Sequence, residues 1–449
     1  MNIFFANFAS LMWGPWLLIL LLGVGFWLTF RLGGIQFRNL FYALRLAFSK
    51  ERAGEGDISH FGALMTALAA TVGMGNIAGV STAVALGGPG AIFWMWMTGL
   101  VGMATKYSES FLAVKYRQVN EHGEISGGPM YYLEHGLGQK WLGMCFAIFG
   151  SLAAFGIGNM IQANTAATAV VESLGASKFS VGLILAVLTA LVIIGGIKRI
   201  SDVASIFVPF MVAIYFVGAL IVILSHLSQL GVGIKLIFEH AFTGTAATGG
   251  FIGASLAQTI RYGVARGLFS NESGMGSASI AAAAAKTNQP AKQALVSMSG
   301  TFLDTLVICS LTALALASTG VWVSGETGVA LTMQAFSAGL PGNWGAFIVT
   351  LSAVTFAFSS ILAWEYYGEK CFEYLFGDKW VHLYRYIWVL FVFVGSMVQL
   401  ELVWNFSDAM NALMAVPNLI GLVLLSGVLF RETKAYEMGI RDGSIDKFD

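Results

Sequence analysis

Charged residues are scarce in this chain of 449 residues. They make up 11% of the sequence, whereas soluble domains carry about 25%. Hydrophobic residues make up 57%, and the mean hydropathy is +0.75. This composition places most of the chain in a lipid bilayer. The formal net charge of zero at pH 7 argues against nucleic acid as a partner.

Cysteines are also few, and a cleavable leader is not evident. The three cysteines, Cys145, Cys309 and Cys371, lie in separate apolar segments without a CxxC pair or a metal-ligand spacing. We therefore expect buried small side chains and no disulfide framework, zinc site or cofactor. The first apolar stretch, 13–32, has no basic residue before it and no small-residue cleavage site. A signal peptide has both, so this stretch is predicted to remain as a span.

Long hydrophobic runs are abundant. About 20 apolar residues cross a bilayer as a helix. Two segments, near 128–136 and 325–338, are too short or too polar and are predicted to be loops or surface helices. Eleven stretches are predicted spans, near 13–32, 62–86, 91–116, 141–171, 180–196, 203–227, 251–284, 292–319, 343–368, 383–400 and 403–430.

The basic residues of the loops predict the orientation, because short cytoplasmic loops carry an excess of Lys and Arg. If the first span ends in the cytoplasm and the spans alternate, nineteen basic residues become cytoplasmic and only Lys178 and Lys235 lie outside. This predicts a multi-pass cell-membrane protein with its N-terminus outside and its C-terminus in the cytoplasm. The cytoplasmic set is Arg31, Arg38, Arg45, Lys50, Arg52, Lys115, Arg117, Lys140, Lys198, Arg199, Lys286, Lys292, Lys370, Lys379, Arg385, Arg431, Lys434, Arg441 and Lys447.

The sequence contains an internal repeat. The tripeptide Gly-Met-Gly occurs at 73–75 and again at 274–276, 201 residues later. Each copy opens a block of five predicted spans, and because five is odd the second block enters the membrane with the opposite polarity. Two five-helix units of inverted topology are a transporter architecture. The predicted divisions are 1–56 for an N-terminal helix and loop, 57–230 and 231–432 for the halves, and 433–449 for a cytoplasmic tail.

Glycine clusters accompany both copies of the repeat. Glycine costs about 1 kcal/mol against alanine in a helix interior, so the clusters at 72–79, 87–90 and 263–276 predict interrupted helices. Irregular backbone survives at membrane depth only where it is packed in protein or lines a cavity. Its free carbonyls suit a cation and the N–H groups of the next half-helix suit an anion, as an amino acid with Na⁺ requires. The alternative is that these glycines only permit close helix packing.

Several long motifs resemble one transporter family. They are Asp57–Phe61, Ala67–Gly79, Gly87–Trp96, Met103–Tyr107, Gly127–Met130, Phe269–Glu272 and Tyr366–Cys371. These motifs resemble the alanine or glycine:cation symporter family, and the resemblance runs from about Trp13 to Lys434. It implies an all-α membrane protein with a leucine-transporter-like 5+5 inverted repeat behind one extra N-terminal helix. It also implies prokaryotic uptake of alanine (D or L) or glycine coupled to Na⁺, less commonly to H⁺.

The resemblance implies a substrate site between the unwound parts of the first and sixth core helices. On the first, the amides after the break are expected to face the substrate carboxylate. On the sixth, carbonyls are expected to face the ammonium group, and bulky walls are expected to limit the side-chain volume. The implied residues are Thr71, Gly73, Gly75 and Asn76 on the first, Phe269, Ser270, Asn271 and Gly274 on the sixth, with Gln162, Ile361 and Trp364 around them.

A sodium site is also expected. Thr355 and Ser359 are four residues apart and share one helix face. Hydroxyl and carbonyl oxygens are hard ligands that suit Na⁺. By analogy with the fold, these hydroxyls would join the carbonyls of Ala69 and Val72, and Asn76 could add its side-chain oxygen. The alternative is that the two hydroxyls bond back to their own helix.

Ionisable residues inside or at the ends of predicted spans include Lys106, Glu109, Glu272 and Asp304. Lys106 and Glu109 are expected to pair, Glu272 to gate the second break or to pair with a nearby arginine, and the role of Asp304 stays open. A channel should show filter loops or charged rings, and an intramembrane enzyme should show a catalytic constellation. The sequence shows neither, so the remaining alternative is a carrier of another small solute on the same scaffold.

Overall fold

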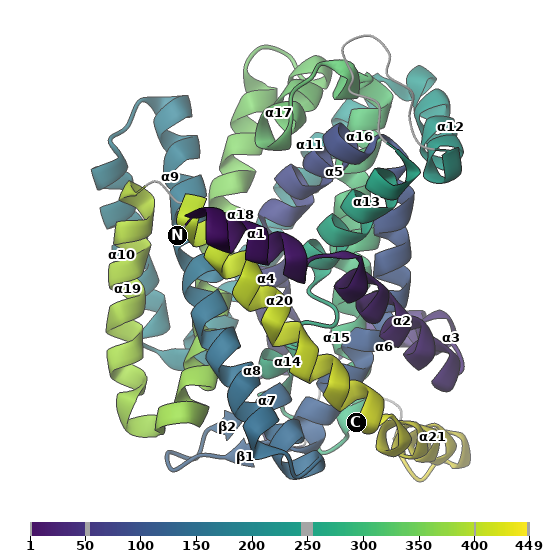
Figure 1. Cartoon of the computed structure of the whole chain (residues 1–449), viewed down its shortest axis with the longest axis vertical. Helices are drawn as coiled ribbons and strands as arrows, with labels where there is room; N and C mark the ends of the chain where they lie inside the picture. Colours follow the sequence, from purple (N-terminus) through teal and green to yellow (C-terminus); the bar gives the residue numbers. More distant parts are fainter. Residues whose placement is uncertain (1, 50–53, 244–254, 399–400, 447–449) are drawn as a thin grey trace.

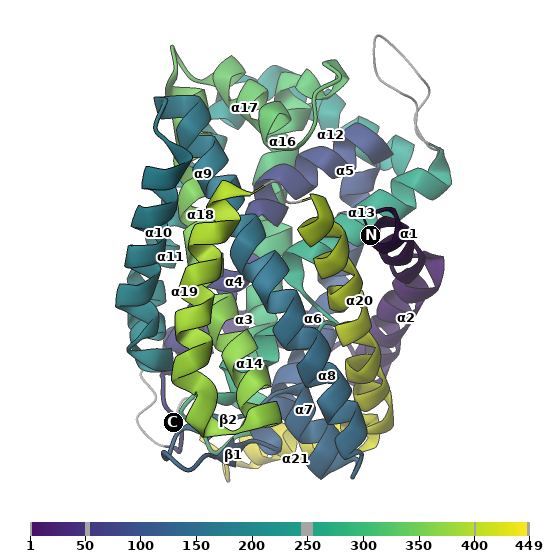
Figure 2. The same ribbon diagram turned by 60° about the vertical axis from the view of Figure 1, so that its left-hand side comes forward.

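The computed structural model describes residues 2–49, 54–243, 255–398 and 401–446. Over these ranges the chain is a single elongated bundle of helices (Figures 1 and 2). One small antiparallel ribbon, formed by β1 (Gln118–Val119) and β2 (Ile125–Ser126), is the sheet found in the described part. Lys50, Arg52 and Lys447, three of the basic residues predicted to be cytoplasmic, lie outside the described residues.

Three helices precede the first half of the predicted repeat. Pro15 begins the second of them, where its missing N–H costs nothing, and this helix packs along α6 of the first half. The third is amphipathic, with Phe37 and Phe41 exposed. The three helices are α1 (Asn2–Met12), α2 (Pro15–Arg31) and α3 (Ile35–Ala47).

The first half contains long helices, two of which are interrupted by stretches of π-helix. Such wide turns are rare and often mark functional sites. The elements are α4 (His60–Thr71), η1 (Gly75–Gly79), α5 (Val80–Gly87), α6 (Ala91–Lys115), α7 (Pro129–Tyr131), η2 (Tyr132–Gly136), α8 (Lys140–Ala153), η3 (Ala154–Met160), α9 (Ile161–Leu174), α10 (Lys178–Ile193) and α11 (Gly196–Ser225).

The second half follows the same pattern, with its own π-helical stretch, η4. Its elements are α12 (Leu227–Thr243), α13 (Leu256–Asn271), α14 (Ala278–Ala283), α15 (Pro290–Thr301), η4 (Phe302–Cys309), α16 (Ser310–Thr319), η5 (Val321–Val323), α17 (Gly328–Gly339), α18 (Trp344–Phe376), η6 (Asp378–Trp380), α19 (Val381–Met397), α20 (Glu401–Leu424) and α21 (Ser426–Asp442).

Each of the eleven predicted spans contains a helix, although the helices differ in length and polarity. In the described ranges, seven helical runs are long and apolar enough to cross a membrane, and the bent pair formed by α4 and the η1–α5 segment makes an eighth. This is a multi-pass membrane protein. The count of eleven stays a prediction, because α10 has only 16 residues and the α13–α14 segment is broken into short helices.

Both predicted breaks are present, but the second is shorter than predicted. α4 ends at Thr71, and the chain bends by 51° before η1 and α5 continue. The second break spans only 272–277, between α13 and α14. The prediction was wrong for Gly263 and Gly267, which lie inside α13. They permit close packing on α6, because a Cβ on either one would overlap Ala91 or Thr98.

The two ends of the bundle carry different elements. The β1–β2 ribbon, α7 and α21, all in the regions predicted to be cytoplasmic, gather at one end (Figures 1 and 2). The other end carries α12 and α17. The connections therefore group as the loop charges predict. The sequence did not predict α12, whose polar residues interrupt an otherwise apolar stretch.

Candidate functional site

The first break meets the last turn of α13, directly before the second break. A Cβ placed on Gly75 of the first break would lie 3.0 Å from the Cα of Ser270 and 3.1 Å from its Cβ. That is tighter than ordinary contact, so the absence of a side chain at position 75 lets the two helices approach. Ser270 is 1% exposed. The breaks thus form one buried junction rather than two separate sites.

Asp304 of η4 links the two breaks through its carboxylate. Asn76 of the first break donates from Nδ2 to Asp304 Oδ1 over 2.8 Å. Ser270, in the last turn of α13 before the second break, donates from Oγ to Asp304 Oδ2 over 2.9 Å, as does the neighbouring Thr305 hydroxyl. Asn271 completes the set, donating to Thr305 Oγ1 over 3.1 Å. Sequence reasoning noticed Asp304 but gave it no role.

The first break is organised by Asn76. Its Oδ1 accepts the N–H of Gly73 over 2.8 Å, and its backbone carbonyl accepts the hydroxyl of Thr312 over 2.7 Å. The side-chain oxygen that the sequence offered to a cation is therefore already hydrogen-bonded within the protein. η1 begins at Gly75, one residue before Asn76, so the positive end of the η1–α5 segment points into the junction. The hydroxyl of Thr71 bonds back to its own helix, at Ala67 O.

The second break is held by Glu109 of α6. Its Oε1 accepts the N–H groups of Gly274 and Gly276 over 2.9 and 3.0 Å and the side-chain amide of Asn418 over 2.7 Å. A Cβ on Gly274 would overlap Leu21 of α2, so this glycine faces α2 and not Gly75. Glu109 thus accepts the N–H groups of the second break. The carbonyls of the last turn of α13 remain as the polar backbone groups that a ligand can reach.

Lys106 lies between two carboxylates of this region. Its Nζ donates to the backbone carbonyl of Glu272 over 3.2 Å and lies 4.0 Å from Glu109 Oε2. The expected pairing of Lys106 with Glu109 is therefore present, although both are buried. Glu272 has a φ of 55°, a left-handed conformation that non-glycine residues rarely adopt. Its carboxylate accepts the hydroxyl of Ser277 over 2.6 Å.

Gln162 stands where η3 passes into α9. The π-helical turn frees the carbonyl of Ile157, which accepts Gln162 Nε2 over 3.0 Å. Among the described residues, nothing donates to Gln162 Oε1, although the residue is only 6% exposed. A buried acceptor without a donor costs about 1–3 kcal/mol. Such a group is suited to receive a donor from a ligand.

Trp364 and Ile361 of α18 are both buried. A Cβ on Gly158 of η3 would overlap Trp364, so this glycine makes room for the indole. The indole of Trp364 lies close to the carboxylate of Glu272, which places α18 beside the second break. Phe269 is half-buried, with the guanidinium of Arg266 lying 5.9 Å from its ring centre.

The hydroxyls expected to bind sodium bond back to α18. Thr355 donates to Leu351 O over 2.8 Å, and Ser359 donates to Phe356 O over 2.9 Å. A neighbour that sequence reasoning missed, Ser360, faces the first break. Its Oγ lies 3.4 Å from Ala70 O, and a Cβ on Gly73 would lie 3.0 Å from it. The spacing of four residues selected the face of α18 that carries Thr355 and Ser359. Ser360 is the next residue along the helix and points to a different side.

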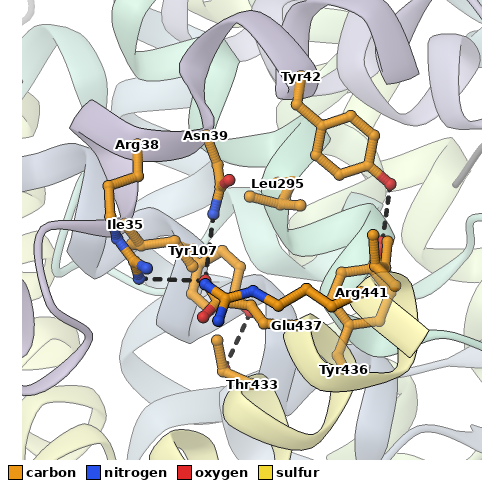
Figure 3. A pocket seen from close by; sticks show the side chains of 11 residues that line it. Ile35, Arg38, Asn39, Tyr42, Tyr107, Leu295, Thr433, Tyr436, Glu437 and Arg441 are labelled. Atoms are coloured by element: carbon orange, nitrogen blue, oxygen red, sulfur yellow. Dashed lines mark hydrogen bonds and ion pairs between the residues drawn. The ribbon is translucent and has the colours of Figure 1, made fainter. Parts of the chain in front are cut away.

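Two pockets open toward the surface at different places. One, of about 230 Å³, lies beside α13 and reaches Phe269, with Arg261, Arg266 and Asp408 on its walls. The other, of about 330 Å³, lies between α3 and α21 (Figure 3). There Arg38 and Asn39 both reach Glu437, and Tyr107 bonds Thr433. Only the first pocket shares a residue with the predicted site.

The end that carries the β1–β2 ribbon is closed by backbone pairing between the two halves. Residues 54–58, just before α4, run beside 284–287, just after α14. The N–H of Asp57 donates to Ala284 O over 2.8 Å, and that of Lys286 donates to Ile58 O over 2.7 Å. Gly56, with a φ of 151°, allows the contact, since a Cβ there would overlap the backbone of Ala285. We call this pairing the inner latch.

Arg117, just beyond α6, clamps the inner latch. Its guanidinium donates to four backbone carbonyls, those of Glu55, Ala283, Ala285 and Thr287, at 2.7–2.8 Å. Burial lowers the pKa of Arg117, while the charges of Glu55 and Asp57 act in the opposite direction. The guanidinium remains a cation there. Sequence reasoning used Arg117 only as one of the loop charges.

Comparisons with known proteins agree with this architecture. The sequence profile of the sodium:alanine symporter family matches residues 1–449. The sodium/alanine symporter AgcS of Methanococcus maripaludis is 54% identical over 438 residues, which cover 95% of each chain. The probable sodium/glutamine symporter GlnT of Bacillus subtilis is 39% identical over 430 residues, covering 95% of this chain and 89% of the relative.

A solved structure supports the fold independently. The crystal structure of MhsT in complex with L-phenylalanine superposes with a TM-score of 0.59, covering 84% of this chain and 90% of the other. The sequences are only 13% identical, so this likeness concerns the fold alone. The helical arrangement described above is thus shared with a solved structure.

Proposed function

The chain belongs to the sodium:alanine symporter family, and on that premise we propose that it takes up alanine (D or L) or glycine together with Na⁺ by alternating access. Its family and relatives indicate a Na⁺-coupled amino-acid symporter rather than an enzyme. The observation that carries the finer proposal is the junction of Gly75 with Ser270, bridged by Asp304. A zwitterion needs amides for one end and carbonyls for the other, and the junction brings both kinds of group together.

The architecture we propose is the 5+5 inverted repeat behind one N-terminal helix, with eleven spans. It is supported by the placement of the breaks at the first helix of each half and by the gathering of the basic loops at one end. In this arrangement α4–α5 and α13–α14 are the first and sixth core helices. The N-terminus lies outside a prokaryotic cell membrane, and the inner latch faces the cytoplasm.

The substrate carboxylate meets the amide of Gly75, where the η1–α5 segment begins. The Gly73 amide could join only by leaving Asn76 Oδ1. The substrate's ammonium group meets the carbonyls of Phe269, Ser270 and Asn271, which close α13 and lack intrahelical donors. Gln162 Oε1, a buried acceptor without a donor in the described part of the chain, is a further partner for the ammonium group. Asn76 acts by shaping the first break, since its amide is held by Asp304 and Gly73.

A small side chain is favoured by the packing around Trp364. Trp364, Ile361 and Phe269 wall the site, and Trp364 is wedged between Gly158 and Glu272. Excluding a larger analogue by steric overlap is easier than rejecting a smaller one, since a lost methylene is worth only about 1–3 kcal/mol. We therefore propose that alanine and glycine enter while leucine clashes. Glutamine, named for one relative, is the informative competitor.

Sodium would bind at the end of α4. The carbonyls of Ala69 and Val72 lie at that end, where a helix leaves its C=O groups unpaired. Thr355 and Ser359 can turn from their own helix toward the ion, and Ser360 already faces this end. Asn76 Oδ1 could join only by releasing the Gly73 amide.

The state described is closed toward the cytoplasm. The inner latch and Arg117 join the two halves there, while the pocket at Phe269 opens on the opposite side of the junction. Release of substrate to the cytoplasm requires the latch to separate. Alternating access follows if the latch and the outer pocket open in turn.

The test is uptake of labelled alanine into proteoliposomes under an inward Na⁺ gradient, an inward H⁺ gradient, or none. We expect accumulation with Na⁺ and its abolition when the Na⁺ gradient is collapsed. Accumulation under the H⁺ gradient alone would show that H⁺, and not Na⁺, is the coupling ion. Saturable uptake that never exceeds equilibrium would indicate a facilitator, and its complete absence for alanine, glycine and glutamine would refute the proposal.

A further inference from the structure

One acidic residue of α18, Glu365, lies outside the two breaks. Glu365 is 0% exposed. In the part of the chain that the structure describes, neither of its carboxylate oxygens has a hydrogen-bond donor. A buried carboxylate is normally paired or hydrogen-bonded, because an isolated charge in a low-dielectric interior is strongly unfavourable. Ionisable groups inside membrane spans are functional candidates for the same reason.

The carboxyl group nearest in sequence on the same helix face is Glu369, one turn further along α18. Arg385 of α19 occupies both oxygens of Glu369, with Nε 2.5 Å from Oε2 and Nη2 3.0 Å from Oε1. This bidentate pairing keeps Glu369 ionised and balances its negative charge with the positive charge of Arg385. The next cation, Lys370, pairs with Glu373 over 2.7 Å. Neither cation is therefore left to neutralise an ionised Glu365.

The side chains of Glu365 and Glu369 lie close enough to act on each other. Two ionised carboxylates can only accept, so a hydrogen bond between them requires one proton. Glu369 keeps its charge through Arg385, so the proton belongs on Glu365. Two carboxyl groups sharing one proton are a recurrent solution where both cannot ionise.

The surroundings of Glu365 offer nothing that would replace the proton. The groups that act on it electrostatically are Glu369, Arg385 and Lys370. From α19, Tyr384 also faces it. The η3 segment on the other side carries no titratable side chain. There Gly368 of α18 is wedged against Tyr384 and Ala154.

We propose that Glu365 is an exchangeable proton-binding site inside the membrane, distinct from the substrate and sodium junction, and that transport requires it to be protonated. The proton stays bound to Glu365, which uses it to form a hydrogen bond to Glu369. When the proton is released it passes to water, and two carboxylates then face the single guanidinium of Arg385. Trp364, the next residue, packs on η3 and lies close to Glu272, so repulsion at Glu365 disturbs the wall of the substrate site. The proposal rests on the proposed symport for its transport readout.

The sign of the pH effect follows from the charges. The protonated form is neutral and compatible with the packed state. As pH rises and the proton is lost, the anionic form repels Glu369, so Na⁺-driven uptake falls. A single ionising group gives about a ten-fold fall for each pH unit beyond its midpoint. Glu365→Gln mimics the protonated acid, because its amide can donate to Glu369 at any pH.

The experiment measures initial alanine uptake at a fixed Na⁺ gradient over a series of pH values, equal on both sides of the membrane. The wild-type chain is expected to lose activity at alkaline pH, while Glu365→Gln keeps it. Glu239→Gln is the control, since it loses only an exposed pair with Lys235 and leaves Lys370 paired with Glu373. It should retain the alkaline fall. The same fall in wild type and Glu365→Gln overturns the proposal.

A second measurement does not depend on transport or on the Gln variant folding. Infrared spectra of the purified chain should contain a protonated-carboxyl band that titrates away at alkaline pH and shifts in Glu365→Asp. A band unchanged by this substitution overturns the proposal. If wild type shows no Na⁺-driven uptake at any pH, the proposed symport fails, while the infrared band still decides the protonation of Glu365.

Discussion

Asn76 and Asp304 are joined by a hydrogen bond of 2.8 Å between Nδ2 and Oδ1, across 228 residues of sequence. Asp304 also accepts the Ser270 hydroxyl, so one carboxylate holds a residue from each broken helix. Both breaks are then fixed relative to η4, a stretch of π-helix. A substrate seated between them would feel a change at Asp304 on both of its ends.

The first prediction concerns this carboxylate. Asp304→Asn keeps the shape but removes the charge and turns one acceptor oxygen into a donor. Hydrogen bonds to charged groups contribute about 1.5–3 kcal/mol, so we expect alanine uptake at subsaturating substrate to fall at least about ten-fold. Thr319→Val is the control, because its hydroxyl only bonds its own helix, at Ala315 O. Equal uptake in both variants would remove Asp304 from the site.

The second prediction concerns substrate size. Trp364→Ala removes the wall between Gly158 and Glu272, so larger amino acids should enter. Competition against labelled alanine checks this: leucine and glutamine should inhibit the variant more strongly than the wild type. Trp344→Ala, at an exposed position on the same helix, is the control and should keep wild-type selectivity. Unchanged selectivity in Trp364→Ala would take Trp364 out of the pocket.

The third prediction concerns the anchor of the second break. Glu109→Gln weakens three hydrogen bonds, from Gly274, Gly276 and Asn418, and leaves Lys106 without its carboxylate. Breaking a buried ion pair by removing one partner costs about 3–5 kcal/mol, so thermal unfolding in detergent should shift down by several degrees. Glu239→Gln is the comparison, since it loses only an exposed pair with Lys235 and should leave the midpoint in place. A shift no larger than that control would argue against the anchoring role.

The fourth prediction concerns the inner latch. Arg117→Gln removes a charge that donates to four carbonyls, so the state closed to the cytoplasm should lose stability relative to the open one. A cysteine placed at Ser277, buried between the latch and the junction, reports this by its labelling rate from the cytoplasmic side. Labelling should accelerate in the Arg117→Gln background. An unchanged rate would mean that the latch does not limit cytoplasmic access.

Much of the fold was predictable because the relevant signals are local. Apolar runs predict spans, and Gly73 with Gly75 predicts a break, since glycine weakens a helix wherever it stands. The same rule failed at Gly263 and Gly267, where close contact with α6 compensates for the missing side chains. Packing between distant segments decides which glycine breaks a helix and which allows two helices to meet.

The backbone breaks of the site were predictable, but the side-chain contacts that hold them were not. Composition and resemblance identified the breaks, whereas Asp304 and Glu109 act through contacts with residues far away in sequence. Arg117 is another such case, since its four carbonyl partners lie in two separate loops. Ser360 was missed because helix periodicity alone cannot say which side of α18 faces α4.

The central claim is that the two breaks belong to one junction, and a double-mutant cycle on substrate binding tests it most directly. Affinity for labelled alanine in saturating Na⁺ is measured for the wild type, Asn76→Ala, Ser270→Ala and the double variant. Since both side chains bond Asp304, their effects should be non-additive by about 0.5–3 kcal/mol. Strictly additive losses, or full alanine binding in either single variant, would contradict a shared site at the two breaks.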